Sequence, residues 1–100
     1  MKVLRLPAVD AEAMEAVQYY AAIDHQLGRR IGKEFEAAVE RIVRFPEGWK
    51  PIGVNLRQCG VKGFPYVVIY LLRADEITVV AFANTHRRPN YWRDRLALPS

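Results

Sequence analysis

The sequence has a single cysteine, Cys59, so it forms no internal disulfide bond. The segment Met1–Met14 contains basic residues but no apolar stretch long enough for a secretory signal. The longest apolar runs, near Tyr66–Leu72 and Ile77–Ala83, are far too short to cross a bilayer. We therefore predict a protein of the reducing cytosol that has no membrane partner.

Residue patterns that hold metals or cofactors are also missing from the sequence. One cysteine and two separated histidines, His25 and His86, do not have the spacing of metal ligands. There is no glycine-rich phosphate loop and no nucleophile elbow of the G-x-S-x-G type. We therefore expect no metal site and no cofactor.

The composition is that of one soluble globular domain spanning residues 1–100, with 51% hydrophobic and 26% charged residues. The net charge of +4 is unevenly placed. Seven acids and five bases give residues 10–45 a charge of −2, whereas eight bases and four acids give residues 46–100 a charge of +4. This distribution points to an anionic partner, either nucleic acid or an acidic protein, and is equally compatible with a solvated basic surface that has no partner.

The first half of the chain predicts one strand and two helices. Residues 2–6 alternate apolar and basic side chains, which is typical of a short strand that Pro7 ends. Apolar residues at three- and four-residue spacing predict helices over 10–24 and 27–45, with Asp10 as the N-cap of the first and Pro46 after the second. Joined by a short turn, they form a helical hairpin.

After Pro46 the periodicity changes to that of strands. We expect a loop over 47–53, a weak strand over 53–60 and strong strands over 66–73 and 76–84. Ala74 and Asp75 form a tight turn between the two strong strands, which makes them antiparallel. Tyr91–Leu98 is expected as a final helical turn or arm. This order predicts an α+β fold in which the helical hairpin packs on one face of an antiparallel sheet.

Three arginines are candidates for binding an anion. Arg57 is expected to point across the sheet toward the residues after Ala83, where Arg87 and Arg88 would complete a concave site. The planar guanidinium binds phosphate or carboxylate through two hydrogen bonds, although each arginine is alternatively a structural ion-pair partner. His86 is the obvious candidate for proton transfer near neutral pH. Aromatic residues such as Tyr66, Tyr70 and Tyr91 are expected mainly as packing residues.

Two stretches of the second half resemble a known family. The first is LRQCGVKGFPYVVIY, residues 56–70, in which an arginine on one strand precedes Phe-Pro-Tyr at the start of the next. The second is TVVAFANTHRRPNYWRDR, residues 78–95, in which a strand leads into Arg-Arg-Pro-x-Tyr-Trp-x-x-Arg. In order and spacing these stretches resemble the RelE/ParE superfamily of toxins from bacterial type II toxin–antitoxin systems. Members often carry a histidine where Asn84 stands, whereas here the histidine is His86.

The resemblance implies a toxin that is neutralised by a cognate acidic antitoxin encoded beside it. RelE-like members cut mRNA on the ribosome, and ParE-like members bind and inhibit DNA gyrase. Only His86 and Tyr91 are candidates for moving protons in RNA cleavage, so the ParE-like activity is favoured, with the ribosome-dependent endoribonuclease as the alternative. A non-toxic basic module that binds nucleic acid is a third hypothesis. The residues expected to bind the target or the antitoxin are Arg57, Tyr66, Arg87, Arg88, Tyr91, Trp92 and Arg95.

Overall fold

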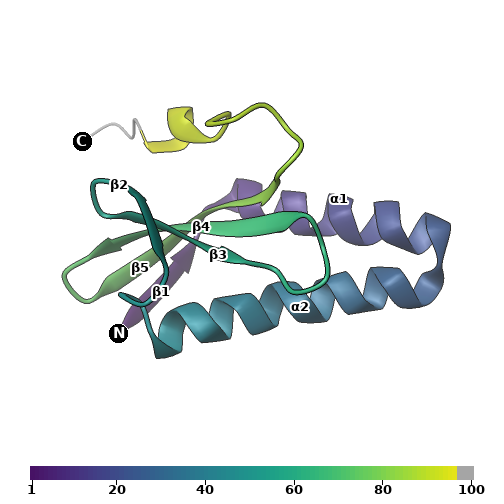
Figure 1. Ribbon diagram of the computed structural model, residues 1–100, viewed down its shortest axis with the longest axis horizontal. Helices are drawn as coiled ribbons and strands as arrows, with labels where there is room; N and C mark the ends of the chain where they lie inside the picture. The colour runs from purple at the N-terminus through teal and green to yellow at the C-terminus, as the bar shows by residue number, and fades with distance from the viewer. Residues whose placement is uncertain (97–100) are drawn as a thin grey trace.

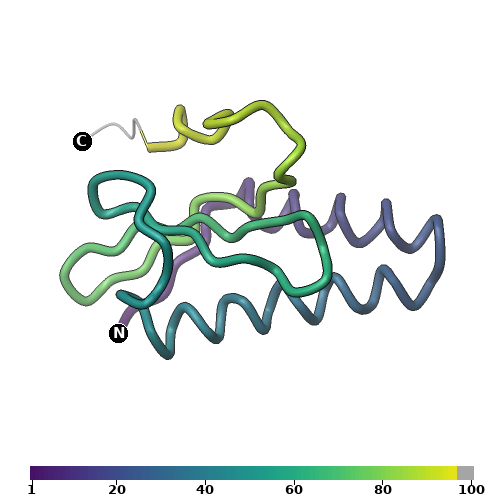
Figure 2. The backbone as a smooth tube through the Cα atoms, viewed as in Figure 1, coloured from purple at the N-terminus to yellow at the C-terminus, as the bar shows by residue number. Residues whose placement is uncertain are grey.

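Two helices cover one face of a five-stranded sheet in the computed structural model, and the last segment of the chain crosses the other face (Figure 1). The structure describes residues 1–96. The strand order is β1-β5-β4-β3-β2. Figure 2 shows that the two helices run side by side and project beyond the sheet. The α+β fold expected from the sequence is confirmed.

The first strand, β1 (Lys2–Arg5), lies at one edge of the sheet and is parallel to β5 (Glu76–Asn84). All other neighbouring strands are antiparallel, so the sheet is mixed and not purely antiparallel. Some seventy residues separate β1 from β5, and therefore no tight turn dictates their relative direction.

The first helix, α1 (Pro7–Ile23), begins three residues earlier than the sequence pattern predicts. Asp10 is therefore not its N-cap: Leu6 occupies that position and makes no side-chain cap. Pro7 starts the helix because its fixed φ suits the first turn and its missing N–H would have had no partner there. Asp10 instead lies in the first turn and approaches the Arg5 guanidinium at 3.7 Å.

The second helix, α2 (His25–Arg44), follows at once because Asp24 caps it. The Asp24 carboxylate accepts a hydrogen bond from the Gln26 N–H at 2.8 Å. The predicted apolar stripe is buried at Ile31, Phe35, Ala38 and Ile42. Gly28 allows α1 and α2 to approach closely near their turn, since a Cβ there would lie 2.7 Å from the Ala21 Cβ.

The segment expected to be a loop contains a strand. β2 (Lys50–Gly53) pairs antiparallel with β3 (Leu56–Gly60) across a turn in which Asn55 has a φ of 59°. The predicted strand over 53–60 is therefore shorter in the structure: it begins at Leu56 as β3, and Val54 and Asn55 form the turn before it. Pro51 is compatible with β2 because β2 is the outer strand of the sheet, where a missing N–H costs no ladder bond.

The strong strands have the predicted positions. β4 (Tyr66–Arg73) and β5 form an antiparallel hairpin across Ala74 and Asp75. Their register shifts where Ile69 pairs with Ala81 and Tyr70 pairs with Val79, so Val80 is an extra residue in β5. The chain then continues as the C-terminal arm (residues 85–96), which ends in the short 3₁₀ helix η1 (Arg93–Leu96). The predicted arm is thus present, although residues 97 and 98 lie outside the described residues.

Apolar side chains form a core on each face of the sheet. The helix-side core includes Ile31, Phe35, Tyr70 and the fully buried Cys59, and the arm-side core is centred on Trp92. Within residues 1–96, no helix is both long and apolar enough to cross a membrane.

Gly28 and Gly32 provide a matched test of the helical hairpin. Gly28→Ala places a methyl group 2.7 Å from the Ala21 Cβ and 2.9 Å from the Val17 carbonyl oxygen. Such overpacking costs about 1–3 kcal/mol, more than the roughly 1 kcal/mol gained in helix propensity. In Gly32→Ala the new methyl group would lie 3.6 Å from the Val17 side chain, which is an ordinary contact distance. Only the gain in helix propensity then remains. We expect thermal unfolding to shift down by several degrees for Gly28→Ala and up for Gly32→Ala, and a lower Tm for Gly32→Ala would contradict this packing.

Candidate functional site

The exposed edge of β5 determines how the C-terminal arm is attached. β1 pairs with β5 only as far as Val79, whose carbonyl accepts from the Leu6 N–H at 3.1 Å before the chain turns into α1. Beyond that point side chains take the place of a neighbouring strand. The Phe82 N–H donates to Glu12 Oε1 at 3.0 Å, and Arg95 Nη1 donates to the Val80 carbonyl at 3.0 Å.

Glu12 binds this strand edge and the arm at the same time. Its carboxylate accepts from Arg95 Nη1 at 2.9 Å and Nη2 at 3.2 Å, and also from the Tyr91 hydroxyl. Arg87 Nη1 approaches the same carboxylate at 3.7 Å. Only 11% of the Glu12 side chain is exposed, so these charge-assisted bonds are well shielded from water. We call Glu12, Arg87, Tyr91 and Arg95 the Glu12 clamp.

The clamp keeps Tyr91 protonated. Burial raises the pKa of the Tyr91 phenol well above its usual range, and the hydrogen bond to Glu12 raises it further. The hydrogen bonds from Arg95 to Glu12 likewise raise the pKa of that guanidinium. Tyr91, one of two candidates for proton transfer, is therefore held as a hydrogen-bond donor within the fold.

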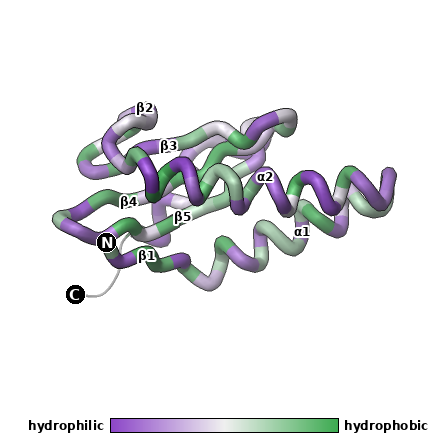
Figure 3. The backbone as a smooth tube through the Cα atoms, turned by 90° about the horizontal axis from the view of Figure 1, so that it is seen from below, coloured by the Kyte–Doolittle hydropathy of each residue, from purple (hydrophilic) through white to green (hydrophobic). Residues whose placement is uncertain are grey.

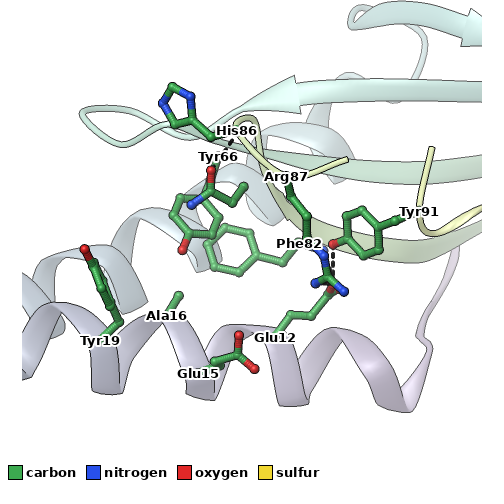
Figure 4. A pocket seen from close by; sticks show the side chains of 10 residues that line it. Glu12, Glu15, Ala16, Tyr19, Tyr66, Phe82, His86, Arg87 and Tyr91 are labelled. Carbon is green, nitrogen blue, oxygen red and sulfur yellow. Dashed lines mark hydrogen bonds and ion pairs between the residues drawn. The ribbon is translucent and has the colours of Figure 1, made fainter. Parts of the chain in front are cut away.

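Beside the clamp lies an open pocket of about 380 Å³ between α1 and the end of β5 (Figure 4). Tyr66 forms part of its wall, with its ring stacked on Phe82 at a centroid distance of 4.6 Å. His86 lies at the rim, and its ring points away from Glu12. The His86 backbone N–H donates to Asn84 Oδ1 at 2.8 Å, so the asparagine side chain stabilises the loop after β5.

Arg57 does not join the other arginines. It pairs with Tyr70 across β3 and β4, and therefore faces the helix-side core, whereas Arg88 lies on the arm side. Arg57 Nη1 donates to the carbonyls of Glu47 at 3.1 Å and Trp49 at 2.7 Å. The predicted concave site of Arg57, Arg87 and Arg88 is thus absent, because strand alternation places Arg57 on the opposite face.

The arm and the sheet instead enclose a second hollow of about 270 Å³, which we call the arm groove. Its floor includes Ile52, Val67 and the buried Trp92, and its rim includes the exposed Arg88 and Arg93. All charged residues lining the arm groove are arginines, and no ion pair joins Arg88 or Arg93 to a carboxylate within residues 1–96.

The predicted residues therefore have different structural positions. Arg87, Tyr91 and Arg95 belong to the clamp, Trp92 anchors the arm, and Arg88 remains open at the groove. The position of Glu12 in the clamp could not be predicted from the sequence, because Phe82, Tyr91 and Arg95 lie 70, 79 and 83 residues away from it. Arg93 could not be predicted either, because nothing in the local pattern separates it from Arg95. Residues 1–96 contain no group of three or more metal-ligating side chains.

Removing the Glu12 carboxylate should free the arm. In Glu12→Ala the Phe82 N–H, the Tyr91 hydroxyl and the Arg95 guanidinium lose their acceptor, which costs about 2–4 kcal/mol. Glu12→Gln keeps a hydrogen-bond acceptor but loses the charge, so the free energy of unfolding should fall less than in Glu12→Ala. Urea unfolding measures both values, and limited proteolysis should cut the arm of Glu12→Ala first. Glu15→Ala, on an exposed position of the same helix, is the control. Equal stability of Glu12→Ala and Glu15→Ala would refute the clamp.

Tyr70 should make the fold sensitive to alkali. Burial raises the pKa of Tyr70 to about 12, and its hydroxyl donates to the Pro46 carbonyl at 2.5 Å. In the unfolded chain tyrosine titrates near ~10. The contribution of Tyr70 to stability should be fully present below about pH 10 and fall as pH rises from there toward 12, because the unfolded chain loses its proton first. Tyr91 adds to this slope, so Tyr70→Phe should reduce the slope without abolishing it. A pH-independent unfolding midpoint between about pH 9 and 12 would contradict this.

Comparisons with known proteins identify the fold and the family. A solved structure described as "Chromosomal ParDE TA system from P. aeruginosa" superimposes with a TM-score of 0.74 at 12% sequence identity, covering 86% of this chain and 97% of that chain. At this identity the likeness establishes the fold alone. No curated protein matches the sequence. The family model described as "ParE toxin of type II toxin-antitoxin system, parDE" matches residues 7–89. Because that match includes both helices and all of the sheet except β1, the chain belongs to the ParE family of type II toxin–antitoxin toxins.

Proposed function

We propose that this toxin acts by binding and inhibiting DNA gyrase, and that a cognate acidic antitoxin neutralises it. The observation that carries the proposal is the arm groove, in which arginines surround an apolar floor in a chain of the ParE family. Arginine and tryptophan beside a pocket are typical of residues that dominate protein–protein binding energy. Such a surface needs no chemistry of its own in order to inhibit an enzyme.

The arginines of the arm differ in whether a carboxylate of the same chain pairs with them. Arg95 is hydrogen-bonded to Glu12, which balances its charge within the fold, whereas Arg87 only approaches the same carboxylate at 3.7 Å. Arg88 and Arg93 are exposed and form no ion pair within residues 1–96, so their charge is available to a partner. An acidic antitoxin segment with an apolar anchor would match both the rim and the floor of the arm groove.

The surroundings of His86 favour binding over RNA cleavage. Cleavage without a metal needs a base for the 2′-hydroxyl and an acid for the leaving oxygen. Tyr91, the other candidate, has its hydroxyl bonded to Glu12, and His86 is exposed at a loop. The ribosome-dependent endoribonuclease is the alternative that the experiment below tests.

Inhibition of plasmid supercoiling by purified gyrase tests the proposal. The double variant Arg88→Ala, Arg93→Ala should lose about 2 kcal/mol of binding, or roughly 30-fold in inhibitory potency. His86→Ala should remain as potent as the unmodified protein. Arg73→Ala, on an exposed position at the end of β4, is the control for loss of an arginine away from the arm groove.

Three results bear on the alternatives. Codon-specific cuts in ribosome-bound mRNA that vanish in His86→Ala would replace gyrase inhibition with the endoribonuclease activity. Equal potency of the double variant and Arg73→Ala would reject the arm groove as the binding surface. Co-expression with the product of the adjacent reading frame should restore growth, and growth inhibition unchanged by that product would reject it as the antitoxin.

A further inference from the structure

The turn end of the helical hairpin carries a second group of cations, remote from the arm. Arg29, Arg30 and Lys33 are exposed in the first half of α2. The exposed Lys62 lies in the connection between β3 and β4, which reaches α2 in Figure 1. We call Arg29, Arg30, Lys33 and Lys62 the hairpin tip.

Two contacts connect the α2 part of the hairpin tip with the β3–β4 connection. The Arg30 guanidinium carbon lies over the Phe64 ring, at 5.3 Å from its centroid. Arg30 Nη2 also lies beside Gly63: a Cβ added to Gly63 would be 3.4 Å from it. Arg30 is therefore partly fixed in place beside Lys62, and segments some thirty residues apart in sequence form one basic surface.

Within the described part of the chain, no carboxylate lies within ion-pair distance of these charges. None of the ion pairs in residues 1–96 involves a residue of the hairpin tip. The Asp24 carboxylate at the turn accepts from the Gln26 N–H as a helix cap. Arg29 and Lys33 are one helical turn apart, where like charges destabilise a helix by a few tenths of a kcal/mol. The first turn of α2 holds no acidic residue that would offset this.

We propose that the hairpin tip binds the phosphate backbone of duplex DNA. The turn end of the hairpin projects from the molecule and carries hydrophilic segments beside hydrophobic ones in Figure 3. Its cations suit the outside of a duplex, which carries a negative charge every ~1.7 Å along its axis. Arg29, Arg30 and Lys33 also line a hollow of about 570 Å³ at this end, whose other lining residues are Gln26, Leu27 and the single acidic residue Asp24. This site lies on α2 and the β3–β4 connection, whereas the proposed gyrase surface lies on the arm. Gyrase acts on duplex DNA, so both surfaces would serve one complex.

Salt dependence of binding to DNA alone measures the contact. A short fluorescein-labelled duplex is titrated with the protein between about 50 and 200 mM salt, with no gyrase present. Four neutralised phosphates predict a log–log slope of about −3.6, which means that affinity falls more than a hundredfold over this range. The triple variant Arg29→Gln, Arg30→Gln, Lys33→Gln should reduce the slope to about −1.

A second triple variant controls for net charge. Lys2→Gln, Lys50→Gln, Arg73→Gln removes three charges at the other end of the sheet, and both variants change the formal net charge from +4 to +1. The control variant should keep the steep slope and at least a third of the affinity. Circular dichroism and thermal unfolding verify that both variants fold.

Each outcome decides the proposal. Strong loss in the tip variant with little loss in the control supports it, and Lys62→Gln added to the tip variant should then remove the remaining slope. Equal loss in both variants means that net charge alone attracts DNA, and overturns it. Absence of salt-dependent binding, or a tip variant that binds the duplex with the same affinity and slope as the unmodified protein, also overturns it. Because the assay contains no gyrase, its result is independent of the gyrase proposal.

Discussion

One carboxylate organises the end of this molecule that carries the arm. β1 is too short to cover the whole of β5, and the uncovered part of β5 would otherwise leave backbone groups without partners. Glu12 and Arg95 supply one acceptor and one donor to that edge, as a neighbouring strand would. Because Glu12 also binds Arg95 and Tyr91, the same interaction closes the sheet edge and fixes the arm over the far face.

This arrangement places neighbouring arginines in different environments. Arg95 has its charge balanced by Glu12 in a shielded position, where an unpaired charge would be costly. Arg93 is two residues away but lies on the other side of the 3₁₀ turn, where it remains exposed beside the arm groove. The proposed binding surface therefore depends on the clamp, although Glu12 itself faces the opposite side of the arm.

The charge distribution also differs between sequence and space. Residues 10–45 have a net negative charge, yet their acids and bases separate once the helices form. Glu12 is bound to the arm and Glu36 to Arg5, whereas Arg29 and Arg30 gather at the turn end of the hairpin. The net charge summed over residues 10–45 therefore does not reveal the basic surface that forms when the helices fold.

The sequence by itself determined the two helices, the hairpin of β4 and β5, and the family. These features depend on local periodicity, on Pro7, Pro46 and the Ala74–Asp75 turn, and on motifs contiguous in the chain. It did not determine the division of β2 from β3, because glycine and proline at an edge strand look like a loop. Only the tertiary structure decided that Arg57 faces the helices, that β1 is parallel to β5, and that Glu12 holds the arm. The physical reason is that these contacts join residues far apart in sequence, and their free energy comes from shared burial and charge pairing, which no local pattern encodes.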